Sequence, residues 1–227
     1  MAHAADTHAA PHQHHYTTTG LDNRKVAIWM FIGSECMLFA SLISTYLIYK
    51  GKNVVGPLPH EVWTNPQTGQ AMKAILNIPI TSISTFVLLM SSFSMVMALA
   101  AVENRNKPRP ANPAFWWKVE NSSKLWLFMT CLMGATFLGF QAYEFTSFVH
   151  EGLTMRTNLF GSSFFTLTGF HGAHVTAGVL WLLTLLAIDY RRGLGPKDAV
   201  NVDIAALYWH FVDVVWIAIF TLVYLIQ

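Results

Sequence analysis

Residues 160–189, FGSSFFTLTGFHGAHVTAGVLWLLTLLAID, decide the fold class of this chain. Only the last of these thirty residues, Asp189, is charged. A helix of about 20 apolar residues, rising about 1.5 Å per residue, crosses the hydrocarbon core of a bilayer. The stretch therefore predicts a transmembrane helix, and two histidines, His171 and His174, lie near its centre.

The rest of the chain has the same apolar character. Of its 227 residues, 53% are hydrophobic and 11% are charged, whereas a soluble domain carries about 25% charged residues. Further stretches that are long enough to cross a bilayer lie at about 26–50, 75–102, 124–150 and 202–226. We therefore predict an all-α, polytopic membrane protein, a bundle of five transmembrane helices that forms one domain over residues 24–227.

Residues 1–23 differ from this domain in composition. They hold five of the ten histidines, namely His3, His8, His12, His14 and His15. They lack the basic start and the apolar core of a cleavable signal peptide. We expect a disordered, His-rich cytoplasmic tail. Imidazole groups bind zinc, copper and nickel, but a flexible cluster of them makes an unselective site.

The basic residues predict an orientation. Ten of the fourteen lie in the N-terminal segment and in the loops after the second and fourth predicted helices, which five spans place on one side. The other side has four: Lys50, Lys52, Lys73 and Arg156. The positive-inside rule then places the N-terminus in the cytoplasm and the C-terminus outside the inner membrane of a bacterium.

Several functional classes find no support in the sequence. Cys36 and Cys131 both fall inside predicted helices, where a thiol behaves as a small hydrophobic group. The chain shows no CxxC pair, no glycine-rich phosphate loop and no nucleophile elbow. It also lacks a basic stripe suited to nucleic acid, so we expect no nucleic-acid partner.

Polar residues inside the predicted spans are the candidates for function. A charged side chain at the centre of a bilayer costs about 2.5–3.5 kcal/mol on insertion scales. Such residues therefore face protein, a lipid headgroup or a cavity rather than acyl chains. The set comprises Glu35, Gln141, Glu144, His171, His174, His210 and Asp213.

The spacing of these residues predicts which of them meet. His171 and His174 share a helix face, as do His210 and Asp213, because residues three apart differ by about 60°. The last two helices should be antiparallel neighbours, which puts Asp213 nearer in depth to His174 than to His171. A row of small residues beside the histidines predicts close approach of another helix there: Gly169, Ala173 and Ala177.

On residues alone, three interpretations stay open: polar packing or lipid contact, a proton or ion path, and a metal or haem site. A copper or zinc site needs three or four convergent ligands, and His210 would supply only a third. A haem-b anchor would pair His171 or His174 with His210. A proton-coupled transporter would use Glu35 and Asp213, but the sequence shows no broken helix or inverted repeat.

Two stretches resemble subunit III of haem–copper oxidases, in the five-span bacterial form: FFTLTGFHGAHVTAG (164–178) and YWHFVDVVWIAIFTLVYL (208–225). Three shorter ones support the resemblance: GSECMLFASLISTY (33–46), LLMSSFSMVMA (88–98) and FLGFQAYEF (137–145). Together they touch all five spans. LTGFHG is more similar to cytochrome c oxidases than to quinol oxidases.

The resemblance implies an enzyme component without haem, copper or quinone of its own, because other subunits hold the haem and copper. It implies packing on catalytic subunit I of a proton-pumping oxidase, beside subunit II and, where the complex has one, a small subunit IV. Cytochrome c would be the electron donor. Subunit III of a quinol oxidase, and a related component of a nitric oxide reductase, are the closer alternatives.

The same resemblance implies roles for individual residues. Subunit III binds phospholipid in a helix-lined cleft and supports proton uptake by subunit I. Buried polar groups that match this support are Glu35, Glu144, His171, His174, His210 and Asp213. Lipid-binding residues are Arg191, which matches an arginine that meets lipid phosphate, with Glu35, His174 and His210. The five-span form lacks two helices that line the cleft in longer relatives.

Overall fold

A computed structural model of the chain describes residues 22–52, 56–64, 71–72, 74–108, 112 and 114–226. Most of the predicted His-rich tail, residues 1–21, lies outside the described residues. The last two residues of that predicted tail already belong to the first helix, because Asp22 caps it and Asn23 begins it. The folded domain thus starts slightly before the predicted boundary.

Five long, apolar helices confirm the predicted fold class, and their ends differ from the predicted ends by at most three residues. In chain order they are α1 (Asn23–Tyr49), α2 (Ile78–Glu103), α4 (Ser123–His150), α5 (Leu159–Arg191) and α6 (Ala199–Ile219), which continues as the π-helical turn η3 (Phe220–Leu225).

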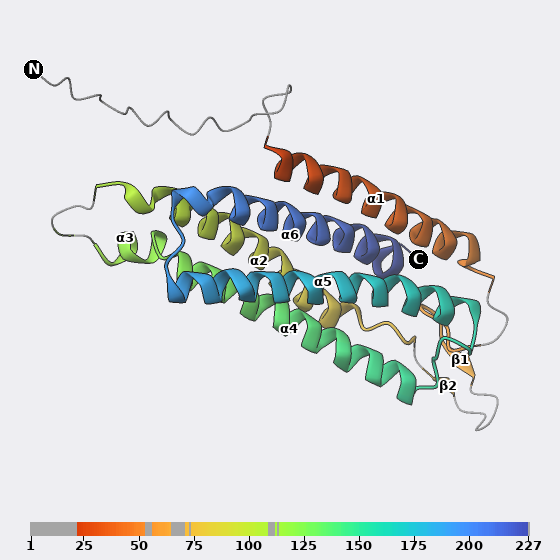
Figure 1. Cartoon of the computed structure of the whole chain (residues 1–227). Helices are drawn as coiled ribbons and strands as arrows, with labels where there is room; N and C mark the ends of the chain where they lie inside the picture. Colours follow the sequence, from red (N-terminus) through yellow and green to blue (C-terminus); the bar gives the residue numbers. More distant parts are fainter. Residues whose placement is uncertain are drawn as a thin grey trace, which may run out of the picture.

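Short elements occupy the connections, which the sequence left as loops. The connection after α2 contains η1 (Asn104–Asn106) and the short helix α3 (Phe115–Glu120), and η2 (Pro196–Asp198) precedes α6. Between α1 and α2, β1 (Trp63–Thr64) pairs antiparallel with β2 (Ala71–Met72). These elements lie at the two ends of the helical bundle (Figure 1).

Side-chain caps explain where the helices begin. Asp22, Asn77, Ser122 and Asn158 each accept a hydrogen bond from a backbone N–H in the first turn of the helix that follows. At the other end of α5, Gly193 adopts a positive φ of 74°. A side chain there would also meet the guanidinium of Arg105, 2.6 Å from an ideal Cβ, so glycine suits this turn on both counts.

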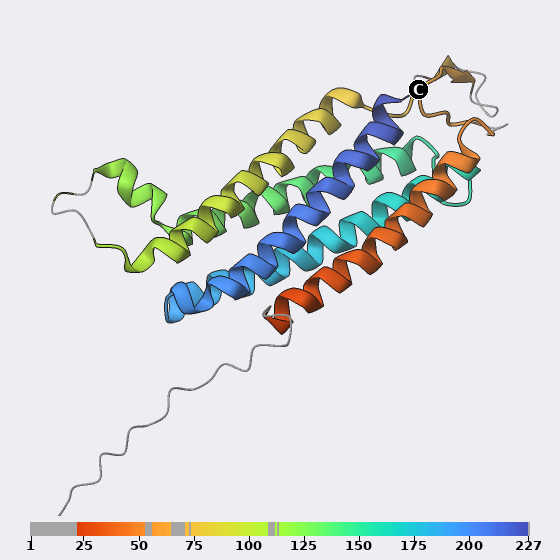
Figure 2. The ribbon, with the colours of Figure 1, turned by 90° about the horizontal axis from the view of Figure 1, so that it is seen from above.

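Helices α2, α4, α5 and α6 form a four-helix bundle, and α1 lies along one edge of it. Figure 2 shows α1 beside α5 and α6, with α2 on the far side of the bundle. In α1 only Ile28, Phe39 and Tyr46 are buried. The start of α1 and the C-terminus lie at opposite ends of the bundle, as five spans require (Figure 1).

Trp209 of α6 fills the centre of the bundle. Its indole ring lies where Gly134 of α4 and Gly178 of α5 leave space, since an ideal Cβ at either glycine would come within 2.7 and 2.8 Å of the ring. The indole Nε1 donates a hydrogen bond to the Ser91 hydroxyl of α2 at 2.9 Å. One tryptophan therefore joins all four helices.

The prediction of close approach at the row Gly169, Ala173 and Ala177 is wrong. A Cβ at Gly169 would have no neighbour within 4 Å, and both alanines are exposed. Helix α6 approaches α5 closely at Gly178 instead, where the missing side chain of the glycine leaves space for the Trp209 ring. The row of small residues lies on the outer surface of α5.

Candidate functional site

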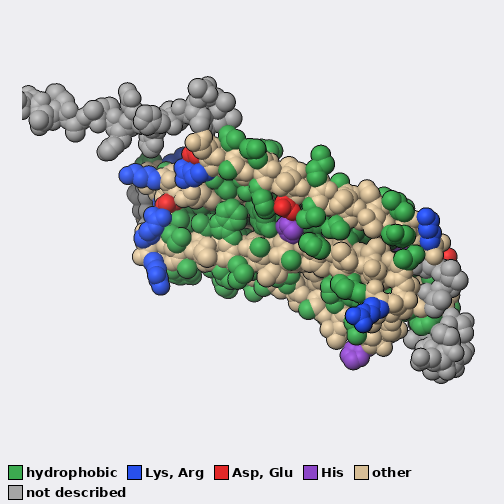
Figure 3. Space-filling model, turned by 45° about the vertical axis from the view of Figure 1, so that its right-hand side comes forward, with side chains coloured by type: hydrophobic (Ala, Val, Ile, Leu, Met, Phe, Trp, Pro, Cys, Tyr) green, Lys and Arg blue, Asp and Glu red, His purple; other side chains and the backbone are tan. Residues whose placement is uncertain are grey.

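Glu35 of α1 and His174 of α5 form a hydrogen-bonded pair in the middle of the membrane-spanning region. Glu35 Oε2 lies 3.1 Å from His174 Nε2, and each side chain is 16% exposed. Glu35 is the thirteenth residue of the 27-residue α1, so the pair lies at about half depth. Figure 3 shows an acidic side chain and a histidine side by side in the middle of an apolar face, as expected for this pair.

The hydrogen bonds of His174 fix how many protons the pair holds. Its Nδ1 lies 2.8 Å from the carbonyl oxygen of Phe170, which can only accept, so Nδ1 carries a proton. A hydrogen bond between Nε2 and Glu35 then needs one further proton, on the carboxyl or on the ring. Either way the pair is neutral overall, which suits its place in the bilayer.

This pairing corrects the prediction from depth, which put His174 with Asp213. The structure instead places the Glu35 carboxyl of α1 directly against the ring of His174. The backbone of His174 does contact α6, because its carbonyl oxygen accepts a hydrogen bond from the Tyr208 hydroxyl at 3.0 Å. The ring, however, points to α1.

His171 lies one turn away from His174 but in a different environment. It is fully buried, and its ring stacks on Trp216 of α6 with centroids 4.9 Å apart. Phe137 of α4 and Phe39 of α1 approach it edge-on at 5.9 and 6.4 Å. Neither ring nitrogen has a hydrogen-bond partner within the part of the chain that the structure describes. His171 and His174 therefore make different contacts although they share a face of α5: His171 packs among aromatic rings, and His174 bonds to Glu35.

His210 and Asp213 face α2. Nδ1 of His210 pairs with the Ser92 hydroxyl of α2. Asp213 is 3% exposed, and neither carboxyl oxygen has a partner of normal geometry among the described residues, although Ser92 lies close to it. The three histidines predicted inside the spans thus have different neighbours: α1 for His174, aromatic rings for His171 and α2 for His210. No three His, Cys, Asp or Glu side chains of the described residues come together as ligands for a metal ion.

The two candidate polar residues on α4, Gln141 and Glu144, contact other helices. Gln141 donates from Nε2 to the Thr168 carbonyl at 2.7 Å, and its side chain occupies the space that Gly172 leaves open on α5. Glu144 accepts hydrogen bonds from the Thr81 hydroxyl at 2.8 Å and the Tyr224 hydroxyl at 3.1 Å. Glu144 therefore joins α2, α4 and η3, apart from the Glu35–His174 pair.

Sequence reasoning missed a buried carboxylate at the end of α5. The Asp189 side chain is 0% exposed, and it accepts hydrogen bonds from Arg105 Nη1 at 3.1 Å, the Ser123 hydroxyl at 2.6 Å and the Leu194 N–H at 2.8 Å. Asp189 thereby links three segments of the chain: the segment after α2, the start of α4 and the loop after α5. No local sequence signal marks it, because its partners come from three separate segments of the chain.

A groove of about 540 Å³ lies between α1, α5 and α6, at the end where α1 begins. It is lined mainly by apolar residues, and Arg24 and Asn201 supply its polar end. Arg24 donates to Asn201 at 2.8 Å and to the Asp22 carboxylate at 2.8 Å. The hydrogen bond from the Arg24 side chain lowers the pKa of Asp22 to about 2. We call this space the α1 groove.

Arg191, the predicted phosphate ligand, is the last residue of α5 and is exposed. Ile188, one turn before it, lines the α1 groove. Arg191 is not itself among the residues that line the groove; it follows Ile188 by three residues, about one helical turn further toward the end of α5.

Known proteins are similar to the chain over nearly its whole length. Residues 5–227 match a protein family described as cytochrome c oxidase subunit III. The chain is 39% identical over 221 residues to the cytochrome c oxidase subunit 3 of Bacillus sp. (strain PS3), covering 97% of this chain and 94% of that protein. It is 34% identical over 225 residues to the quinol oxidase subunit 3 of Bacillus subtilis (strain 168), covering 99% and 97%.

Proposed function

Because the chain belongs to the cytochrome c oxidase subunit III family, we propose that it is a non-redox, structural and regulatory subunit of a proton-pumping cytochrome c oxidase in a bacterial inner membrane. It packs on catalytic subunit I, beside subunit II and, where the complex has one, a small subunit IV. The haem and copper belong to the partner subunits. Cytochrome c delivers the electrons.

Two features of α1 support this proposal: the Glu35–His174 pair and the α1 groove. A neutral polar pair in the middle of an apolar face holds α1 on the bundle without a net charge in the bilayer. The α1 groove has an apolar wall and a polar end with a guanidinium, which suits a phospholipid with its phosphate at the membrane surface. A lipid there would cover the poorly buried α1 and support proton uptake by subunit I indirectly.

Isolation of the complex tests the proposal. The full-length chain, tagged at its C-terminus and extracted in mild detergent, should bring down a haem–copper catalytic subunit that oxidises reduced cytochrome c. Recovery of the chain without such a subunit would overturn the assignment. A Soret band carried by the isolated chain, and lost on His174→Ala or His210→Ala, would support a haem anchor instead.

The second candidate is subunit III of a quinol oxidase. The observation that favours it is the similarity to the quinol oxidase subunit 3 of Bacillus subtilis over 99% of this chain. The isolated complex separates the two candidates, because it would then oxidise a quinol and leave reduced cytochrome c unchanged.

Lipid binding at this end of the bundle gives a prediction for Arg191, the last residue of α5. A guanidinium grips a phosphate with two parallel hydrogen bonds, which a lysine ammonium cannot reproduce. Arg191→Lys should therefore lower the phospholipid that co-purifies with the complex, measured by phosphate assay and mass spectrometry. Lys197→Arg, on η2 at the same end of the bundle, is the matched control and should leave the lipid content unchanged. If Arg191→Lys also leaves it unchanged, Arg191 acts only as a positive anchor.

The charge distribution predicts the orientation in the membrane. At the end where α1 begins, the described residues include nine basic ones: Arg24, Lys25, Arg105, Lys107, Lys118, Lys124, Arg191, Arg192 and Lys197. At the other end they include three, Lys50, Lys52 and Arg156. Much of the basic surface in Figure 3 lies at the first end. We propose that this end is cytoplasmic.

A fusion after Gln227 tests this orientation. A reporter that is active only in the cytoplasm should be silent there, whereas alkaline phosphatase, which needs the outer side, should be active. The opposite pattern would contradict the proposed topology, because five spans place the two termini on opposite sides.

A further inference from the structure

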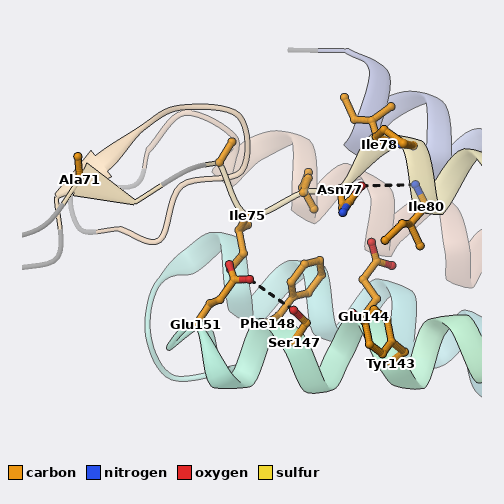
Figure 4. A pocket seen from close by; sticks show the side chains of 13 residues that line it. Ala71, Ile75, Asn77, Ile78, Ile80, Tyr143, Glu144, Ser147, Phe148 and Glu151 are labelled. Carbon is orange, nitrogen blue, oxygen red and sulfur yellow. Dashed lines mark hydrogen bonds between the residues drawn. The ribbon is translucent and has the colours of Figure 1, made fainter.

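An acid-lined pocket lies between the start of α2 and the end of α4, on the side of the bundle away from α1. Its volume is about 640 Å³. Figure 4 shows Glu144 and Ser147 of α4, and Glu151 directly after it, facing the segment that leads into α2, from which Ile75 and Asn77 come. The pocket lies at the end of the bundle that holds the C-terminus. It includes neither Glu35 nor His174, and it shares no lining residue with the α1 groove.

The pocket continues into an apolar groove along α4. A second hollow of about 600 Å³ shares Ile80 and Tyr143 with the pocket and is otherwise lined by Thr136, Gly139 and Phe140. From Glu151 to Thr136 the helix rises roughly 22 Å, at about 1.5 Å per residue. That length equals about one leaflet, half of a bilayer 40–45 Å thick. The two hollows together have the length and polarity of one membrane lipid.

The charges in the pocket select a cation. Among the described residues that line it, there are two carboxyl groups and no lysine or arginine. Glu144 is 9% exposed, and both of its oxygens accept hydrogen bonds, from Thr81 and Tyr224. Each oxygen keeps a second lone pair for a ligand. Glu151 is exposed at the mouth, where it accepts from the Ser147 hydroxyl at 3.4 Å. An anionic headgroup would meet two negative groups here.

We propose that this pocket binds the headgroup of a phospholipid that ends in a primary ammonium, the phosphatidylethanolamine class, with one acyl chain in the groove along α4. The ammonium has three N–H donors, for which Glu144, Glu151 and the Asn77 side chain offer acceptors. The lipid phosphate stays at the mouth, next to water. This site lies apart from the α1 groove and goes beyond the proposed function.

Photolabelling of the intact complex in lipid nanodiscs tests the site. The probes are phosphatidylethanolamine, phosphatidylglycerol and phosphatidylcholine, each with a diazirine on an acyl chain, and the readout is the labelled peptide by mass spectrometry. The ethanolamine probe should label residues 136–143 about tenfold more than the other two, because one charge-assisted hydrogen bond contributes about that factor. Equal labelling by all three probes, or no label on this segment, would overturn the proposal.

Two variants locate the headgroup and the chain. Glu151→Gln should lower labelling about tenfold by removing the charge at the mouth. Gly139→Leu should block the groove, and it fits the fold because a Cβ at Gly139 has no neighbour within 4 Å. Glu120→Gln and Gly33→Leu make the same changes elsewhere, at an exposed glutamate and an equally open glycine, and should leave labelling unchanged. Labelling that survives both test variants would contradict the site.

A soluble competitor separates a lipid from a free amine. Glycerophosphoethanolamine carries the same headgroup without acyl chains, so it should not displace the probe at equal concentration. Displacement would show that a soluble amine is the ligand and would overturn the lipid assignment. None of these outcomes bears on co-purification with the catalytic subunit, which tests the proposed function separately.

Discussion

Asp189→Leu is expected to lower the free energy of unfolding by about 3 kcal/mol. The substitution leaves three donors without their acceptor: Arg105 Nη1, the Ser123 hydroxyl and the Leu194 N–H. Breaking a buried ion pair costs about 3–5 kcal/mol. The lower value applies because the Arg105 side chain is 42% exposed and can turn its charge toward water. The measurement is thermal or denaturant unfolding of the complex in mild detergent.

A surface ion pair at the same end of the bundle provides the control. Arg192 and Asp198 lie 2.8 Å apart, with the Arg192 side chain 61% exposed. The hydrogen bond from Arg192 lowers the pKa of Asp198. Pairs of this kind contribute about 0–1 kcal/mol, so Asp198→Ala should have a much smaller effect than Asp189→Leu. Equal effects of the two variants would mean that Asp189 is not the centre of a buried network.

The membrane-spanning helices could be predicted because length and apolar character alone decide them. In lipid every backbone polar group must be satisfied within the segment, which leaves a helix as the only structure for one apolar stretch. The caps also follow from local sequence, since Asp22 and Asn158 each directly precede a span. The position of Trp209 could not be predicted, because it depends on Gly134 and Gly178 of two other helices.

The polar contacts were predictable as a set but not as pairs. The free-energy cost of inserting a polar side chain into the bilayer shows that Glu35 and His174 need polar partners. The helix face and the membrane depth of each residue restrict which partners are possible. Neither property shows which helix packs opposite that face. The sequence paired His174 with the neighbouring α6, whereas α1, distant along the chain, packs against that face of α5. Asp189 escaped notice for the same reason, since its partners come from three separate segments.

The Glu35–His174 pair should show strong coupling in a double-mutant cycle. Glu35→Leu leaves His174 Nε2 without a partner, and His174→Leu leaves the carboxyl alone in an apolar face. Each variant should lower stability by about 1–3 kcal/mol, the cost of an unsatisfied buried polar group. The double variant removes both groups, so it should lose at least about 1 kcal/mol less than the sum of the two. The free energy of unfolding of the complex in detergent is measured for the wild type, the two single variants and the double variant.

Glu35→Gln and the double variant then separate packing from proton chemistry. Because His174 Nδ1 already donates to Phe170, Nε2 can accept from the amide of glutamine, so Glu35→Gln should assemble normally. It cannot, however, exchange the proton that Glu35 and His174 Nε2 share in the wild-type pair. If the pair supports proton uptake, Glu35→Gln and the double variant should both lose activity after fewer turnovers, despite intact assembly and unchanged haem spectra of subunit I. If both variants keep the wild-type number of turnovers, the pair only fastens α1 to α5, and its proposed role in proton uptake is wrong.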